Sequence, residues 1–244
     1  MREILVVREF DNFSRILSES GLKVINCPTI EVAPLEDLSD FEAKLDVIEN
    51  YDGVFLTSAN ATEIFRAKLS VRNINYRGKI YVLGKRSFDL LNGENQDLVF
   101  DKTANTAREM LENIALDKLK NKRFLFVRGV SSLRVVPEFL EKIAAVDEAI
   151  VYRSSRVTVA DDKIKEIQAK LAKGEIACAC FFSPSAAESF LQQFGAEDLH
   201  QIKITVIGNT TAEFFERRDL TVDFVASRAT AEDFAVELID YLKI

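Results

Sequence analysis

The sequence predicts an α/β protein of two similar domains, each a parallel sheet flanked by helices in a flavodoxin-like arrangement. Short apolar runs rich in β-branched and aromatic residues alternate with segments of helical periodicity. Alternation of this kind implies right-handed crossovers and a parallel sheet covered on both faces. A second observation is that many features recur about 124 residues apart, and a chain of 244 residues is long enough for two cores.

The expected strands follow one another along the whole chain. They are VVR, GVFLT, IYVLG, FLFVR, AIVY, CACFFS, ITVIG and VDFV. Near-continuous apolar runs such as ACACFF predict strands buried on both faces. A helix is expected near the C-terminus, where one stripe carries Phe234, Leu238, Ile239 and Leu242.

The repeat is clearest where expected strands end and helices begin. In each matching pair, an apolar run ends in a hydroxyl residue or a glycine, and a polar helix start follows. The pairs are residues 54–65 with 180–190 and residues 79–87 with 203–211. Ser58 thereby matches Ser183, and the fold is predicted to be doubled.

One match wraps around the chain and predicts the domain boundaries. RFLFVRG resembles the first strand, REILVVRE, which brings Arg128 over Arg8. One domain is therefore contiguous, at about 31–155, and the other is split, at about 1–30 plus 156–244. The segments PTIEVAP and YRSSR are expected to be two short linkers, with the active-site cleft between the domains.

Composition excludes several classes of protein. With 48% hydrophobic and 29% charged residues and no apolar run near the roughly 20 residues of a membrane helix, a soluble protein is expected. The N-terminus MREILVVREF is too short and charged for a signal peptide, which favours the cytoplasm. A net charge of −7 argues against general nucleic-acid binding. A monomer is expected, because no surplus apolar stripe stands out.

Cofactor sites are not indicated. The three cysteines, Cys27, Cys178 and Cys180, lack the spacing of a metal site and are expected to be buried thiols. A single histidine, His200, cannot supply a histidine metal site or a catalytic triad. We therefore expect no metal site built from histidine or paired cysteine.

Polar residues recur at the carboxyl ends of the expected strands, where helix N-termini offer free N–H groups to anions. These candidate residues are Arg8, Thr57, Ser58, Ser87, Arg128, Ser183 and Thr210. Each hydroxyl alone could be a helix N-cap. Capping explains less well why two copies present hydroxyls, a glycine and an arginine at equivalent strand ends, and an anion-binding surface explains this better.

Three functions remain open on these residues alone: an enzyme, a non-catalytic two-lobed receptor for an anionic metabolite such as a polycarboxylate, and a doubled scaffold whose junctions only cap helices. A receiver-like scaffold is disfavoured, because Asp161 and Asp162 open an expected helix instead of ending a strand.

The ordered set LVVR, FLTSANA, a glycine turn after a strand, FVRG, AIVYR, FFSPSA and VIGNTTA resembles the uroporphyrinogen-III synthase family over the whole chain. The resemblance implies an enzyme that takes the linear tetrapyrrole hydroxymethylbilane, inverts its terminal ring, loses water and closes the macrocycle as uroporphyrinogen III. Such enzymes use no metal or organic cofactor. The substrate carries eight carboxylates, which suits a receptor of amides, hydroxyls and cations.

The resemblance also implies roles for particular residues. Tyr152 stands where the family usually has a tyrosine thought to assist departure of the hydroxyl, and its repeat counterpart is Pro28, so the twofold similarity breaks there. Lys203, at a position often basic in relatives, joins the seven strand-end residues as a substrate-binding candidate. Expected partners are the substrate and, transiently, the preceding pathway enzyme, with no nucleic acid and no membrane.

Overall fold

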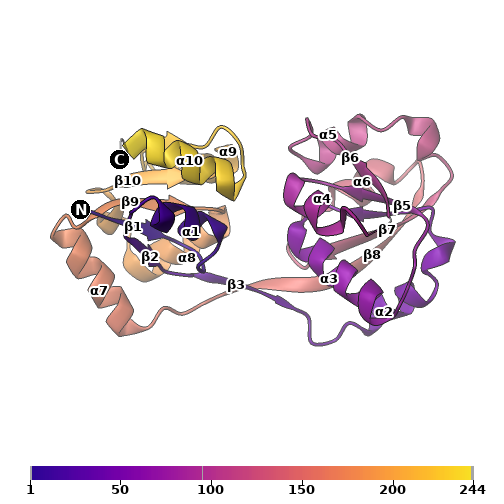
Figure 1. Ribbon diagram of the computed structural model, residues 1–244, viewed down its shortest axis with the longest axis horizontal. Coiled ribbons are helices and arrows are strands. Elements are labelled where there is room, and N and C mark those ends of the chain that lie inside the picture. The colour runs from indigo at the N-terminus through magenta and orange to yellow at the C-terminus, as the bar shows by residue number, and fades with distance from the viewer. Residues whose placement is uncertain (1, 95, 243–244) are drawn as a thin grey trace. The chain divides into compact units, whose positions relative to one another are not determined.

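The computed structural model describes residues 2–94 and 96–242 and divides into two compact units. The split unit comprises Met1–Glu31 and Ser155–Ile244, and the contiguous unit comprises Val32–Ser154. Each unit contains one sheet with helices on both faces, which confirms the predicted α/β class (Figure 1).

The split unit is built on a five-stranded sheet of order β11-β10-β9-β1-β2, in which all neighbours are parallel. Its strands are β1 (Glu3–Val6), β2 (Val24–Asn26), β9 (Ile176–Phe181), β10 (Lys203–Val206) and β11 (Phe224–Val225). Its helices are α1 (Asn12–Glu19), α7 (Asp161–Ala172), α8 (Pro184–Phe194), α9 (Asn209–Glu216) and α10 (Ala231–Leu242), with a 3₁₀ turn η3 (Glu197–Leu199).

The contiguous unit is built on a six-stranded sheet of order β3-β8-β7-β4-β5-β6. Its strands are β3 (Ile30–Pro34), β4 (Gly53–Leu56), β5 (Lys79–Val82), β6 (Asp97–Phe100), β7 (Arg123–Gly129) and β8 (Ala145–Arg156). Its helices are α2 (Ser39–Asp46), α3 (Ala59–Val71), α4 (Lys85–Leu91), α5 (Ala107–Glu112) and α6 (Val135–Leu140), with 3₁₀ turns η1 (Ile48–Asn50) and η2 (Leu116–Lys118). In the part of this order that runs from β8 to β6, each strand is parallel to its neighbour.

The two sheets have the same order once the start of the chain is shifted. Counted along the chain within the split unit, the strands lie in the order 2-1-3-4-5, which is the flavodoxin-like arrangement. Apart from β3, which adds a sixth strand beside β8, the contiguous unit has this order when counting starts at β7, continues through β8 and returns to β4. This shift is the physical basis of the sequence match that wraps around the chain.

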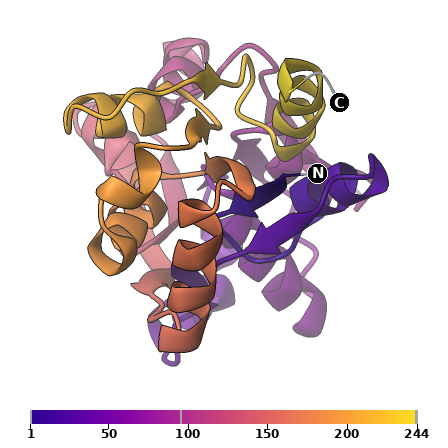
Figure 2. The ribbon, with the colours of Figure 1, turned by 90° about the vertical axis from the view of Figure 1, so that its left-hand side faces the viewer.

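Both faces of each sheet are buried, as the apolar strands predict. On β1, Ile4 and Val6 contact the cluster that contains α1 and α10, whereas Leu5 contacts the cluster that contains α7, α8 and α9. In Figure 2, indigo α1 and yellow α10 lie on one side of this unit and orange α7 and α8 on the other. In the contiguous unit, α2, α3 and α4 cover one face, and α5 and α6 cover the other.

The chain crosses between the units within two strands. β3 spans the first crossing and β8 the second, and these strands are neighbours in the sheet order. The expected linkers are thus paired strands, with Leu35 N–H donating to the Val151 carbonyl at 3.0 Å. Tyr152, expected at the end of a strand, consequently lies inside one that continues to Arg156.

That the contiguous unit is an independent domain stays a prediction. We expect a fragment of residues 30–156 to fold alone, because it retains all of β3 and β8 together with the two cores of its sheet. Chemical denaturation of the fragment followed by circular dichroism should show one cooperative transition. A fragment that is unfolded in buffer would contradict the expectation.

Candidate active site

The contiguous unit places Thr57, Ser58, Arg128 and Tyr152 near the carboxyl ends of β4 and β7. β4 and β7 are neighbours, and they are where the strand order reverses its direction of growth. Ligands of open parallel sheets bind beyond the carboxyl ends of the strands at such a switch point. Ser58 follows the end of β4 after one residue, and the turn Gly129–Ser132 follows β7.

Ser58 is the N-cap of α3. Its backbone is extended, and its Oγ accepts a hydrogen bond from Ala61 N–H at 3.2 Å. The capping account of the sequence is therefore correct for this residue. The hydroxyl has a second partner, however, because Tyr152 O–H donates to the same Oγ at 3.2 Å. Thr57, half-buried, lies between this cap and the end of β4.

Tyr152 reaches Ser58 because β8 contains an irregularity in register. Arg128 pairs with Ile150, but the next residue, Gly129, pairs with Tyr152, so β8 has one extra residue there. An extra residue of this kind turns the following side chain. Val151 and Tyr152 consequently contact the same core cluster, although successive strand residues normally point to opposite faces.

Gly129 makes room for the Tyr152 ring. A Cβ at this glycine would lie 2.4 Å from Cζ and 2.5 Å from Cε2 of Tyr152. The ring therefore packs against bare backbone, and any other residue at position 129 would displace it. Neither the bulge nor this close approach has a pattern in the sequence that could reveal it.

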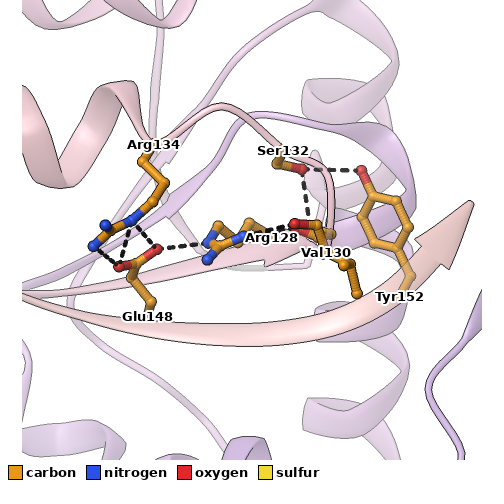
Figure 3. A network of polar contacts seen from close by, with 7 residues as sticks. Arg128, Val130, Ser132, Arg134, Glu148 and Tyr152 are labelled. Atoms are coloured by element: carbon orange, nitrogen blue, oxygen red, sulfur yellow. Dashed lines mark hydrogen bonds and ion pairs between the residues drawn. The ribbon is translucent and has the colours of Figure 1, made fainter. Parts of the chain in front are cut away.

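Ser132 is a further hydroxyl at this place, and the sequence analysis did not identify it. Its Oγ accepts a hydrogen bond from Gly129 N–H at 3.0 Å and lies 3.5 Å from the Tyr152 hydroxyl oxygen (Figure 3). The turn is closed by Ser132 N–H, which donates to the Gly129 carbonyl at 3.2 Å. Three hydroxyls thus lie in a row.

Arg128 is engaged by the protein itself. Its Nε donates to Glu148 at 2.6 Å, and its Nη1 donates to the carbonyls of Gly129 at 2.9 Å and Val130 at 3.3 Å. Arg134 binds the other side of the same carboxylate at 2.6 Å. The guanidinium of Arg134, together with that of Arg128, holds the pKa of Glu148 below its ordinary value, against the opposing effect of burial. Sequence reasoning found the arginine and missed its partner.

The lowered pKa of Glu148 makes its stabilising effect dependent on pH. Its folded-state pKa lies below the unfolded value, so the contribution is complete above about pH 4.3 and is lost as pH falls through the folded pKa. Glu148→Gln should reduce the free energy of unfolding by about 1–3 kcal/mol at pH 7 and by less at pH 3.5. Urea denaturation at both pH values measures this.

Glu138→Gln is the matched control, since Glu138 is exposed in the neighbouring helix α6. Its effect should stay within about 0.5 kcal/mol at either pH. An effect of Glu148→Gln that does not change with pH would contradict the ionic explanation.

The split unit carries a second group of hydroxyls at the ends of β9 and β10, which are parallel neighbours. Ser183 caps α8, its Oγ accepting from Ala186 N–H at 3.2 Å and lying 3.1 Å from Ser185 Oγ. Thr210 is exposed in the first turn of α9. These positions correspond to the β4 and β5 ends of the contiguous unit, as the repeat predicts.

Arg8 lies two residues beyond β1 instead of at its last residue. It forms an ion pair with Asp11, the N-cap of α1, at 3.1 Å, and its guanidinium carbon lies 4.4 Å from the centroid of the Phe182 ring. Like Arg128, it is therefore held by groups within its own unit. The sequence did not reveal these partners because they depend on local turn geometry.

Two predicted residues are not brought to these strand ends as accessible groups. Ser87 lies in the first half of α4 and is only 2% exposed. Lys203 is the first residue of β10, at the opposite edge of the sheet from Ser183 and Thr210, with its Nζ 4.3 Å from the centroid of the Tyr241 ring. The length of the strand separates its amino end from the binding edge, so this geometry does not support Lys203 as a substrate-binding residue.

The cysteines are buried and free, as predicted. Burial raises the pKa of the Cys27 thiol to about 11 and raises that of Cys180 as well. Within residues 2–94 and 96–242, no group of three or more His, Cys, Asp or Glu side chains could hold a metal ion. Over the same residues, no helix has both the length and the apolar character to cross a membrane.

The fold and the strand-end hydroxyls define a doubled flavodoxin-like α/β protein with candidate anion-binding edges. Two solved structures share this fold over nearly the whole chain. A uroporphyrinogen-III synthetase from Helicobacter pylori has a TM-score of 0.66 at 19% identity, covering 99% of this chain and 100% of that one. A mutant uroporphyrinogen III synthase from the bacterium Thermus thermophilus has a TM-score of 0.63 at 13% identity, covering 100% and 99%.

Sequence comparison identifies the family. A uroporphyrinogen-III synthase of Chlorobaculum parvum is 26% identical over 255 aligned positions, covering 100% of both chains. A porphyrin biosynthesis protein HemD of Ruminiclostridium josui is 23% identical and matches 98% of this chain, which spans 48% of that protein. The family profile described as uroporphyrinogen-III synthase HemD matches residues 11–235. This chain belongs to the uroporphyrinogen-III synthase family.

Proposed function

We propose that this chain is an enzyme that closes hydroxymethylbilane to uroporphyrinogen III, with inversion of the terminal ring and loss of water. The observation that carries the proposal is the hydrogen bond from Tyr152 O–H to Ser58 Oγ at the switch point of the contiguous unit, in a chain of this family. A serine hydroxyl that accepts a hydrogen bond from a phenol can donate its own hydrogen to a departing oxygen without a metal or an organic cofactor.

The reaction needs assistance mainly at one bond. The carbon–oxygen bond of the hydroxymethyl group breaks, the oxygen leaves as water, and the remaining cationic azafulvene is attacked by the terminal ring. Hydrogen bonds to the departing oxygen stabilise the charge that develops on it. A phenol, with a reference pKa of about 10, is a weak acid, so we assign Tyr152 a hydrogen-bonding role that acts on this oxygen through Ser58.

The remaining task is to hold the substrate so that the less obvious carbon of the terminal ring attacks. We propose that hydroxyls and helix N-termini bind the substrate carboxylates, with Thr57 and Ser58 at α3, Ser183 at α8 and Thr210 at α9 as donors. The support for this is their position at equivalent strand ends in the two units.

The contacts of the other predicted residues give less support for substrate binding. Direct carboxylate binding by Arg8 and Arg128 stays a prediction, since each already forms an ion pair. Binding by Ser87 also stays a prediction, and we leave Lys203 out of the proposed site. The cytoplasmic location, the monomeric state and the transient contact with the preceding pathway enzyme are proposals that rest on the sequence; three free thiols agree with a reducing compartment.

The test is a coupled assay in which hydroxymethylbilane is generated in situ and the oxidised products are separated by chromatography. The proposal expects uroporphyrin of type III to predominate when the protein is present, whereas the spontaneous product without enzyme is type I. If a folded protein yields type I alone, the enzyme assignment is wrong. The binding protein for an anionic tetrapyrrole then becomes the better explanation of the strand-end donors.

A further inference from the structure

We propose that Ser132 is a positioning residue that makes the Tyr152 phenol a donor to Ser58 and directs the Ser58 hydrogen toward the substrate. The inference rests on the proposed function, in which Tyr152 and Ser58 act at the departing hydroxyl. It adds a residue and a direction of hydrogen bonding that neither the sequence pattern nor the repeat indicates.

The direction follows from counting hydrogens. A phenol has one hydroxyl hydrogen, and Tyr152 donates it to Ser58 Oγ at 3.2 Å. In the contact between Ser132 and Tyr152 either oxygen could donate, so Ser132 must be the donor when Tyr152 is bonded to Ser58. The order of donation is Ser132 to Tyr152 to Ser58.

Ser58 is the end of this row. Its oxygen accepts hydrogen bonds from Tyr152 O–H and Ala61 N–H, which leaves its own hydrogen for another acceptor. Hydroxyls that accept hydrogen bonds become stronger donors, because a chain of such bonds polarises each member. Ser58 thereby becomes the donor that meets a departing or carboxylate oxygen, with Tyr152 reinforcing it from behind.

Ser132 can hold this direction because the turn that carries it is fixed on several sides. Gly129 N–H donates to Ser132 Oγ at 3.0 Å, so the serine oxygen is occupied as an acceptor and its hydrogen can point to Tyr152. Val130 N–H donates to the Tyr152 carbonyl at 2.9 Å, which ties the turn to β8 beside the phenol. Arg128 holds the carbonyls of Gly129 and Val130 while Glu148 holds Arg128 (Figure 3).

The distance between Ser132 Oγ and the Tyr152 oxygen, 3.5 Å, is long for two hydroxyls. Hydrogen bonds of catalytic groups are often long without substrate and tighten when it binds. We therefore expect the contact to shorten once Ser58 gives its hydrogen to a substrate oxygen, because the polarisation of the row then increases.

The first experiment compares Ser132→Ala with Ser131→Ala in the coupled assay. Ser131 is the exposed neighbour in the same turn, so Ser131→Ala makes the same chemical change one residue away and is the matched control. We expect Ser132→Ala to lower kcat for the type III product about threefold to tenfold with little change in KM, as for the loss of one hydrogen bond to a positioned group. Ser131→Ala should be unchanged, and Ser132→Thr, which keeps the hydroxyl, should restore most of the rate.

A double-mutant cycle decides whether Ser132 acts through Tyr152. In a Tyr152→Phe background, Ser132→Ala should have no further effect on kcat, because the acceptor of its hydrogen bond is gone. The same fold-loss in both backgrounds would overturn the proposal.

A spectroscopic measurement separates this inference from the proposed function. With tyrosine labelled with ¹³C at Cζ, the Tyr152 signal is assigned by its disappearance in Tyr152→Phe. Ser132→Ala should shift this signal and Ser131→Ala should leave it in place, whether or not the protein forms the type III product. An unshifted signal in Ser132→Ala overturns the inference even if the enzyme is active, whereas absence of type III product from the wild-type protein rejects the function.

Discussion

Tyr152→Phe should lower kcat for type III uroporphyrinogen about tenfold to a hundredfold while the protein remains folded. Only the phenolic oxygen is removed, and the ring, which packs in the core of the contiguous unit against Gly129, stays the same size. The departing hydroxyl then loses the donor that reinforces Ser58. The coupled assay measures the effect as a smaller type III fraction, because the uncatalysed type I product competes.

The control removes a phenolic hydroxyl elsewhere in the same unit. Tyr76 is buried, and its hydroxyl donates to the Tyr51 carbonyl at 2.9 Å. Tyr76→Phe should lower the free energy of unfolding by about 1 kcal/mol and leave the product ratio unchanged. Equal loss of type III product in the two variants would mean that Tyr152 acts through stability alone.

Gly129→Ala should disturb both the fold of the contiguous unit and the position of Tyr152. The new Cβ would meet Tyr152 Cζ at 2.4 Å, far inside van der Waals contact, and the rigid ring or the turn would have to move. We expect a loss of about 1–3 kcal/mol in the free energy of unfolding and a loss of activity at least as large as that of Tyr152→Phe. Urea denaturation and the coupled assay measure the two effects separately.

Gly208→Ala is the matched comparison for stability. A Cβ there would meet Ala229 Cβ at 3.7 Å, an ordinary contact, and the backbone is extended with φ of 178°. Its unfolding free energy should change by less than about 1 kcal/mol. If Gly129→Ala were equally harmless, the close packing of Tyr152 on this turn would not be required for the fold.

The features that the sequence predicted are those that depend on the residues within one short segment of the chain. Each of the eight expected runs overlaps a strand, although β1 overlaps VVR only at Val6 and β11 covers only the last two residues of VDFV. The stripe that contains Phe234 and Leu238 is the buried face of α10. Ser58 and Ser183 were found because each follows an apolar strand and caps a helix, and both halves of that pattern are readable in a short segment. The wrapped match between RFLFVRG and REILVVRE reflects the strand order, since β1 has the same place in its sheet as β7 has among the strands from β8 to β6.

The features that the sequence did not predict depend on contacts between segments far apart. β2, β3 and β6 were not among the expected strands, and all three lie at the outer edges of their sheets, where each pairs with one neighbour. The extra residue in β8 is defined only by its register against β7. Ser132 therefore had no detectable role, because its contact with Tyr152 exists only after those two strands have paired.

The insertion of one unit into the other also sets an order of folding during synthesis. In the split sheet, β1 pairs with the central strand, β9, and Ile4 is aligned with Cys178, which is 174 residues later. At about 5–20 residues per second, a ribosome completes that partner roughly 10–35 s after β1. The contiguous sheet can close in the meantime, while the emerged β1 has an unpaired edge that nascent-chain chaperones would have to shield.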